Sequence, residues 1–316
     1  MSTRPNQTQS RLSPPVLFGI MAAMIIAVGV MQSWSVAFSL INLCLISAIM
    51  ALGVNIQWGY AGLFNVGVMG FAALGGVSVI LVSMPPVAEA VQAGGGAIMA
   101  GALIILATVI AAAFTWKAVK HNKRSRYWVM SLVIAIGYFV MRYVVDPGTD
   151  AIEAVNPATT GYLGGFGLPV LVAWPVGALI AAGAAWVIGK VSLGLRSDYL
   201  AIATLGISEI VIYVLKNEEW LTRGVKNVNG LPRPVPYEID LQGALWFQDW
   251  ANRLGIPVDD ASSLFVKIAF ALLFIAVLAV LIWLSEVALK SPWGRMMRAI
   301  RDNETAAAAM GKNVTW

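Results

Sequence analysis

Side chains capable of covalent or acid–base chemistry are scarce in this sequence. It has one histidine, His121, in a basic loop, and one cysteine, Cys44, inside an apolar segment. One cysteine forms no disulfide within the chain, and zinc-type sites need several histidine or cysteine ligands. No GxxxxGK[ST] phosphate-binding loop occurs anywhere in the chain. The sequence therefore predicts no catalytic residue, no metal site and no bound cofactor, and it disfavours an intramembrane enzyme, which needs a catalytic pair among its apolar segments.

Polar side chains inside apolar segments are the candidates for a translocation path. An ionisable residue in a membrane span is costly and therefore suggests a function, and Glu209 is such a residue. Asn42, Asn55 and Asn65 lie in or beside the second and third apolar segments. Hydrogen bonds between helices are the alternative role for all four. As a lining, the three amides would suit a zwitterion or an amide better than an ion.

The segment SPWGRMMRAIRDNETAAAAMG, residues 291–311, brings arginines, acids and alanines directly after a long apolar run. Ser291 is a helix N-cap residue and Pro292 suits the first helical position, which predicts a helix to about Arg301. Either Asp302 or Asn303 is predicted to cap a second helix.

The second helix is short and rich in alanine. Glu304 suits its positive N-terminal end, residues 306–309 propagate it, and Gly311 adopts the left-handed conformation that ends it. Contacts between the arginines and anionic lipid headgroups are the simpler interpretation. They do not explain the alanines, whose small side chains favour a helix that docks in a groove of another protein.

The composition is that of a polytopic membrane protein. Of the 316 residues, 59% are hydrophobic and only 12% are charged, whereas soluble domains have about 25% charged residues. The net charge of +5 does not indicate a nucleic-acid partner, because the lysines and arginines separate apolar runs. We expect an all-α fold of one transmembrane permease domain, residues 1–316.

About eight spanning helices are predicted from apolar runs of about 20 residues. They cover Val16–Gln32, Val36–Ile56, Tyr60–Met84, Ala97–Trp116, Tyr127–Val145, Leu168–Val191, Tyr199–Leu215 and Leu264–Leu289.

The basic residues predict the orientation of these helices. Eight spans place four basic segments on one side, which is then cytoplasmic: residues 1–15, 117–126, 190–196 and 291–313. The opposite side receives residues 146–167, predicted to be irregular, and the long loop 216–263. In that loop, Leu241–Leu254 is predicted to form an amphipathic helix. Its face of Trp246, Phe247 and Trp250 would lie at the membrane interface or, alternatively, bind an external partner.

Residues 291–311 resemble the cytoplasmic loop of permease subunits in the branched-chain amino acid family of ABC importers. LRSDYLAIATLGISEIV (195–211), GYAGLFNVG (59–67) and TRGVKNVNGLP (222–232), the last similar to a Thr-Gly-Gly-x-x-Gly-like external turn, agree with this resemblance. It implies that a Glu-Ala-Ala-type helix ending near a glycine inserts into the ATPase. The coupling residues would be Asn303, Glu304, Thr305, Ala306, Ala307, Gly311, Arg298 and Arg301.

The chain departs from the family pattern at several places. Thr305 stands where an apolar residue or alanine is more usual, and Asn65-Val66-Gly67-Val68 replaces Ser-Leu-Gly-His. Residues 87–150 resemble an insertion. Family members continue into further spans after the coupling loop, so we expect further C-terminal helices beyond this chain.

The resemblance also implies the partners and the substrate. The partners would be two ATP-binding subunits, which carry ATP and Mg²⁺, and a related permease subunit that forms a heterodimer with this chain. A periplasmic binding protein and membrane lipids are the other partners. The complex would lie in the bacterial inner membrane. The substrate would be a branched-chain or related amino acid. A permease for urea or short amides is one alternative. An ion-coupled secondary transporter is another, although such carriers usually hold several embedded acids and internal repeats.

Overall fold

The computed structural model describes residues 13–118, 123–158, 160–192, 194–195 and 197–311. Within these ranges the chain is helical and has no strand, which confirms the all-α prediction. Of the predicted cytoplasmic segment 1–15, only residues 13–15 are described. His121, Arg196 and residues 312–313 also lie outside the described residues. The helices are α1 Pro14–Met31, α2 Trp34–Val54, the π-helix η1 Asn55–Tyr60, α3 Val68–Ser83, α4 Ala88–Ala118, α5 Lys123–Ala154, α6 Val170–Ser192, α7 Ser197–Asn217, α8 Glu219–Thr222, α9 Glu238–Gly243, α10 Leu245–Arg253, α11 Val258–Lys290, α12 Pro292–Asp302 and α13 Glu304–Ala309.

Among the described residues, seven helices are long and apolar enough to cross a membrane, and α3 is a shorter apolar helix. The predicted span Tyr60–Met84 is therefore wrong in its first part, because residues 61–67 are not helical. Gly62 has a φ of 72°, a left-handed conformation that ends the π-helix. The second and third predicted spans thus form one apolar run with a break in the backbone.

Three other helices extend beyond their predicted ends. Helix α4 begins nine residues before the predicted Ala97, at Ala88, and α11 begins at Val258 instead of Leu264. Helix α5 continues to Ala154 with Pro147 inside it, so the irregular segment predicted from Asp146 begins only after residue 154. The reason is tertiary: a Cβ atom at Gly148 would collide with Ala97 of α4, so this glycine permits a close helix contact that outweighs local propensity.

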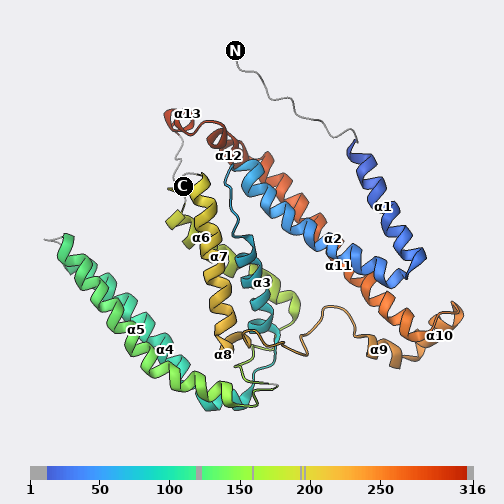
Figure 1. Cartoon of the computed structure of the whole chain (residues 1–316), viewed down its shortest axis with the longest axis horizontal. Coiled ribbons are helices and arrows are strands. Elements are labelled where there is room, and N and C mark those ends of the chain that lie inside the picture. Colours follow the sequence, from blue (N-terminus) through green and yellow to red (C-terminus); the bar gives the residue numbers. More distant parts are fainter. Residues whose placement is uncertain (1–12, 119–122, 159, 193, 196, 312–316) are drawn as a thin grey trace. The chain divides into compact units, whose positions relative to one another are not determined.

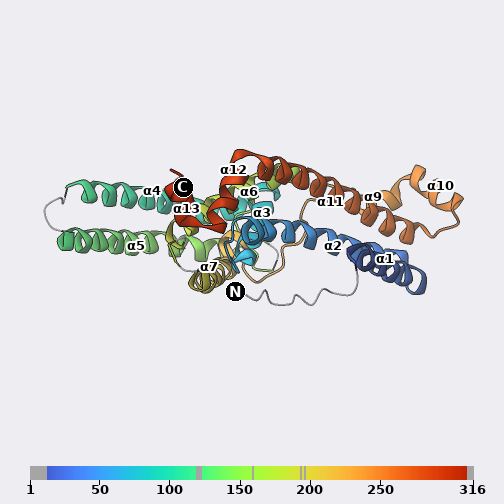
Figure 2. The ribbon, with the colours of Figure 1, turned by 90° about the horizontal axis from the view of Figure 1, so that it is seen from above.

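The chain forms two compact units. The first unit contains residues up to 64 together with those from 235 onward. In it, α2 and α11 lie side by side over much of their length, and α1 packs on α2 (Figures 1 and 2). Helices α9 and α10 form a small apolar core with the beginning of α11, around the fully buried side chain of Phe247.

This core corrects the prediction for the loop 216–263. The amphipathic helix Leu241–Leu254 is interrupted at Ala244, which separates α9 from α10. Trp246 and Trp250 are 62% and 45% exposed, whereas Phe247 is buried against Phe265 of α11. The three aromatic side chains therefore do not form one exposed face, because the loop packs against its own spanning helix.

The second unit contains residues 65–234. Helix α3 packs against α6 and α7, and α4 and α5 form a long antiparallel hairpin (Figure 1). The end of α3 is joined to the segment before α6 by backbone hydrogen bonds, including one of 2.9 Å from the Leu168 amide to the Val82 carbonyl. These contacts hold the end of α3, which at 16 residues is shorter than the seven helices long enough to cross a membrane.

Candidate functional site

The helix pair α12–α13 has the local structure predicted from the sequence. Ser291 Oγ accepts a hydrogen bond of 3.4 Å from the Gly294 amide, and Pro292 is the first helical residue. Asn303, rather than Asp302, caps the second helix: its Oδ1 accepts from the Ala306 amide at 3.0 Å. Gly311 follows α13 with a φ of 77°. Satisfied caps at both helix starts give the pair a defined shape outside the spanning helices.

Between α12 and α13 lies a groove of about 520 Å³. Its lining residues are Pro292, Arg295, Met296, Ala299, Asp302, Asn303, Ala306, Ala307 and Met310. Ala307 is only 6% exposed, because it packs within the pair. Glu304, Thr305 and Ala306 are exposed. Of the predicted coupling residues, Asn303, Ala306 and Ala307 thus line the groove of the pair, whereas Glu304 and Thr305 are exposed and do not line it.

The arginines of α12 donate hydrogen bonds to carbonyl oxygens. Arg295 Nη1 lies 3.1 Å from the Lys290 carbonyl, and Arg298 Nη2 lies 3.4 Å from the Leu289 carbonyl, both at the end of α11. The last carbonyls of a helix lack partners within it and carry partial negative charge, so cations are favourable there. Arg301 instead donates from Nη1 to the carbonyl of Gly59 in η1, at 2.5 Å.

The four residues predicted to line a path make separate contacts. In the first unit, Asn42 Nδ2 donates to the Lys267 carbonyl of α11 at 3.0 Å, and Asn55 lies beside Gly59. Asn42 and Asn55 are thirteen positions apart, about 20 Å along a helix at 1.5 Å per residue. These two amides therefore do not form one binding site.

The other two path candidates belong to the second unit. Asn65 Oδ1 accepts from the Gly67 amide at 2.8 Å and so forms the turn that leads into α3. Glu209 is exposed on α7. The buried polar contacts of α7 come instead from Thr204 and Ser208, which accept from the amides of Val66 and Gly70 at 3.2 Å and 2.8 Å.

Sequence reasoning missed Thr204 and Ser208. The sequence feature that could have identified them is their spacing: two hydroxyl residues four positions apart lie on one face of a helix. They pack against Gly67 and Gly70 of the second unit, where a Cβ atom would lie 2.5 Å from the Thr204 carbonyl oxygen or 2.9 Å from Ser208 Oγ. Small residues at these positions let the two helices approach closely.

Lys267 was also missed, although it is a charged residue within α11. Its Nζ donates to Ser35 Oγ at 2.6 Å and to the Ser35 carbonyl at 3.2 Å. Ser35 lies in the first turn of α2. The available signal was one lysine interrupting a long apolar run, the pattern that identified Glu209.

Arg223 organises the turn that resembles the family's glycine-rich external motif. Its φ is 65°, and Gly224 follows with a φ of 58°, so arginine stands at a position where glycine is favoured. Its side chain is buried, and its guanidinium donates to the carbonyls of Asn227 and Ala158. These bonds offset the cost of the left-handed backbone. Burial raises the pKa of the nearby Tyr162, and the charge of Arg223 acts in the opposite direction.

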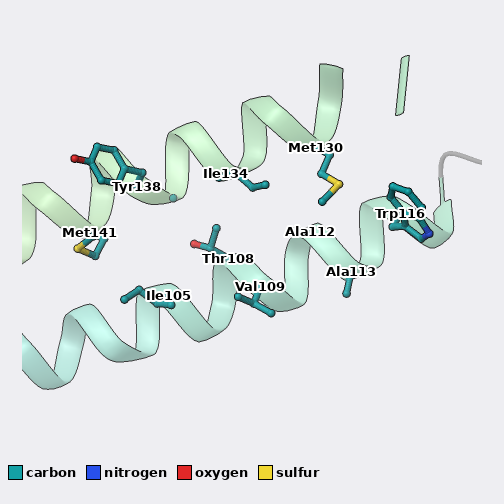
Figure 3. A pocket seen from close by; sticks show the side chains of 11 residues that line it. Ile105, Thr108, Val109, Ala112, Ala113, Trp116, Met130, Ile134, Tyr138 and Met141 are labelled. Atoms are coloured by element: carbon teal, nitrogen blue, oxygen red, sulfur yellow. The ribbon is translucent and has the colours of Figure 1, made fainter. Parts of the chain in front are cut away.

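An apolar groove of about 680 Å³ lies between α4 and α5 (Figure 3). Its lining is aliphatic and aromatic except for Thr108, whose hydroxyl donates to the Ile104 carbonyl of its own helix at 2.7 Å. No charged side chain lines it. It therefore offers no charged group to form an ion pair with the ammonium or carboxylate of an amino acid.

Comparisons with known proteins place this chain among transport proteins. A family model described as "Branched-chain amino acid transport system / permease component" matches residues 154–316. The matched region contains the stretches 195–211, 222–232 and 291–311, whereas 59–67 lies outside it.

Two curated relatives are "High-affinity branched-chain amino acid transport system permease protein LivM" of Salmonella typhimurium and of Escherichia coli. They are 30% and 31% identical over 154 and 150 residues, which are 48% and 46% of this chain. These alignments cover 35% and 34% of the relatives, so the chain spans about a third of their length. No solved structure matches the chain.

Proposed function

Because this chain belongs to the family of branched-chain amino acid transport system permease components, we propose that it is a membrane-spanning subunit of an ATP-driven importer. The substrate would be a branched-chain or related amino acid delivered by a periplasmic binding protein. The observation that carries this proposal is the pair α12–α13, a capped, alanine-containing surface within the matched region. A carrier that works alone needs no such surface.

In this proposal α13 docks into an ATPase subunit. Two ATPases would bind ATP and Mg²⁺, and a related permease subunit would complete the pathway. Asn303, Glu304, Thr305, Ala306 and Gly311 would form the docking end, with Ala307 and Arg298 supporting it. ATP binding would shift the spanning helices between an outward-open and an inward-open state. For this to happen, the ATPases must make different contacts with the permease in these two states.

The proposed orientation places α12–α13 in the cytoplasm of a bacterium, with the complex in the inner membrane. Eight crossings, with the short α3 counted as one, place residues 117–126 and α12–α13 on the same side as the N-terminus. The excess of lysine and arginine in these segments supports that side as the cytoplasmic one. A cysteine at Thr305 that reacts with an impermeant reagent from outside the cell would contradict it.

Asn42, Asn55, Asn65 and Glu209 remain proposed contacts of the translocation path. Glu209 is the sharpest test, because its exposed carboxylate needs a polar partner or water in the assembled membrane complex. We expect Glu209→Gln to reduce ATP-driven uptake. Unchanged uptake would remove Glu209 from the path.

The main test is purification of the natural full-length protein from its native membrane in mild detergent, followed by mass spectrometry. We expect to recover two ATPase subunits and a sister permease. Ala308, which is exposed on α13, provides a matched pair of variants: Ala308→Arg should lose the ATPases, whereas Ala308→Ser should retain them. Recovery of the chain alone would contradict the importer and favour an ion-coupled carrier. Competition by leucine, urea and acetamide in uptake assays then separates the substrate classes.

A further inference from the structure

Arg301 is the one arginine of α12 that reaches beyond the junction with α11. Arg295 and Arg298 donate to carbonyls between Leu289 and Gly294. Arg301 donates to Gly59, which is 242 positions away in sequence. Its side chain is 36% exposed, so the contact lies at the surface of the first unit, where the guanidinium can move away without disrupting a packed core.

The carbonyl that Arg301 contacts belongs to an irregular helix end. The carbonyls of Ile56, Gln57 and Trp58 accept hydrogen bonds from amides five, six and four residues later, respectively. An α-helix would keep a constant spacing of four, so the end of α2 is wider than an α-helix. The Gly59 carbonyl accepts from Arg301 instead of from a backbone amide in the described turn. The arginine therefore supplies a bond that the widened turn leaves unmade.

The side chain of Arg301 also packs against the residue that ends the turn. A Cβ atom at Gly62 would lie 2.6 Å from Arg301 Cγ, and the φ of 72° independently favours glycine there. The arginine thus holds the turn with two parts: its guanidinium binds the Gly59 carbonyl, and its aliphatic stem covers Gly62.

Asp302 orients the guanidinium. Its Oδ1 accepts from Arg301 Nε at 2.9 Å and from Nη2 at 2.8 Å, which leaves Nη1 directed to Gly59. Since Arg301 lies on the last turn of α12 and α13 begins two residues after Asp302, movement of the pair moves the guanidinium.

We propose that Arg301 is a positioning residue that links α12–α13 to the π-helical end of α2 and controls the helical register of Asn55–Tyr60. Withdrawal of the guanidinium removes the bond to Gly59 and favours rewinding of η1 toward α-helical spacing. A change of register by one residue turns the following chain by about 100° and moves it by about 1.5 Å. The chain that follows is the break, residues 61–67, that leads into α3. This inference rests on the proposed function, which supplies the force on α12–α13.

The first experiment measures amide hydrogen exchange of the full natural protein in lipid nanodiscs. We expect Arg301→Gln to increase the exchange rates at Ala61, Gly62 and Leu63 about tenfold, because their present hydrogen bonds must break whenever η1 changes register and the charged donor no longer holds the turn closed. Arg301→Lys should give an intermediate increase. Lys290→Gln is the matched control, since Lys290 pairs with Glu286 of its own helix at 2.7 Å, and it should leave these rates unchanged. Equal rates in Arg301→Gln and the native protein would overturn the link.

The second experiment uses the assembled complex. We expect nucleotide binding to change the exchange of residues 55–64 in the native complex and not in Arg301→Gln. The variant should still hydrolyse ATP, with uptake per ATP reduced at least fivefold. If Arg301 served only to stabilise the fold, Arg301→Gln would instead lower the recovery of the ATPases and the uptake together, and uptake per ATP would not change.

The outcomes of the two experiments are distinguishable. If no ATPase is recovered with the native chain, the proposed function and the transmission role fail together, while the exchange rates of the isolated chain still decide whether Arg301 holds the turn. If ATPases are recovered but nucleotide leaves the exchange of 55–64 unchanged, the importer stands and the role of Arg301 is wrong.

Discussion

The two units use different kinds of polar contact between their apolar helices. In the second unit, α3 and α7 meet through Gly67 and Gly70 on one side and the hydroxyls of Thr204 and Ser208 on the other. In the first unit, α2 and α11 meet through longer side chains: Lys267 reaches Ser35, and Asn42 reaches the backbone of α11. The first kind of contact depends on backbone proximity, and the second depends on side-chain reach.

The two kinds of contact differ in how much helix movement they tolerate. A hydroxyl bonded directly to a backbone amide leaves no room for an added methyl group. A lysine has several rotatable bonds and keeps its hydrogen bond through small helix movements. The α2–α11 contact also contains a buried polar atom without a hydrogen-bond partner, Asn42 Oδ1. We therefore expect α3–α7 to be the stiffer contact and α2–α11 to be the more adaptable one.

The largest expected effect is at Gly70. A Cβ atom there would lie 2.9 Å from Ser208 Oγ and 3.0 Å from Ser208 Cα, so Gly70→Ala should lower the free energy of unfolding by about 1–3 kcal/mol through overpacking. Gly75→Ala in the same helix is the matched control, because nothing lies within 4 Å of its Cβ position. It should be neutral or stabilise by up to about 1 kcal/mol. Detergent unfolding of both variants measures the difference, and equal stabilities would remove the proposed distinction.

A smaller effect is expected between Ser35 and Lys267. The ammonium lies 2.6 Å from Ser35 Oγ, and buried hydrogen bonds between membrane helices couple by about 0.6–1.7 kcal/mol. A double-mutant cycle with Ser35→Ala and Lys267→Met should give a coupling energy in this range. A coupling near zero would mean that the lysine finds water or lipid instead, and that α2 and α11 are held by apolar packing alone.

The smallest effect is expected at Asn42. Its Oδ1 has no partner in the described structure, while its Nδ2 donates one hydrogen bond. Leucine has a similar shape and removes both polar atoms, so Asn42→Leu should change the free energy of unfolding by less than about 1 kcal/mol. Uptake by the assembled complex is the second measurement. Retained stability with reduced uptake would assign Asn42 to the translocation path, whereas a large loss of stability would make it a structural residue.

The helix pair shows how far local sequence determines structure. Ser291, Pro292, Asn303 and Gly311 have the roles that their chemistry predicts, because a cap is satisfied within a few residues of the chain. The spanning helices were also predictable from local sequence, because about twenty consecutive apolar residues form a helix in a membrane whatever lies beside them.

Other features were not predictable from local patterns. The apolar residues from Tyr60 to Met84 predicted one spanning helix, yet residues 61–67 are not helical and follow a π-helix whose end Arg301 contacts. Proline and glycine near residue 147 indicated an irregular segment, yet α5 continues because Gly148 fits against α4. Phe247 was assigned to an exposed face and is buried, because Phe265 of α11 lies opposite.

The sequence by itself determined the membrane class, the approximate spans and the capped helix pair. Tertiary structure alone decided where the chain breaks in the predicted third span, which polar side chains meet, and which arginine of α12 contacts another helix. The physical reason is the range of the interactions. Caps and apolar length depend on neighbours within a few residues, whereas the contacts Ser208–Gly70, Ser35–Lys267 and Gly59–Arg301 join residues 138, 232 and 242 positions apart.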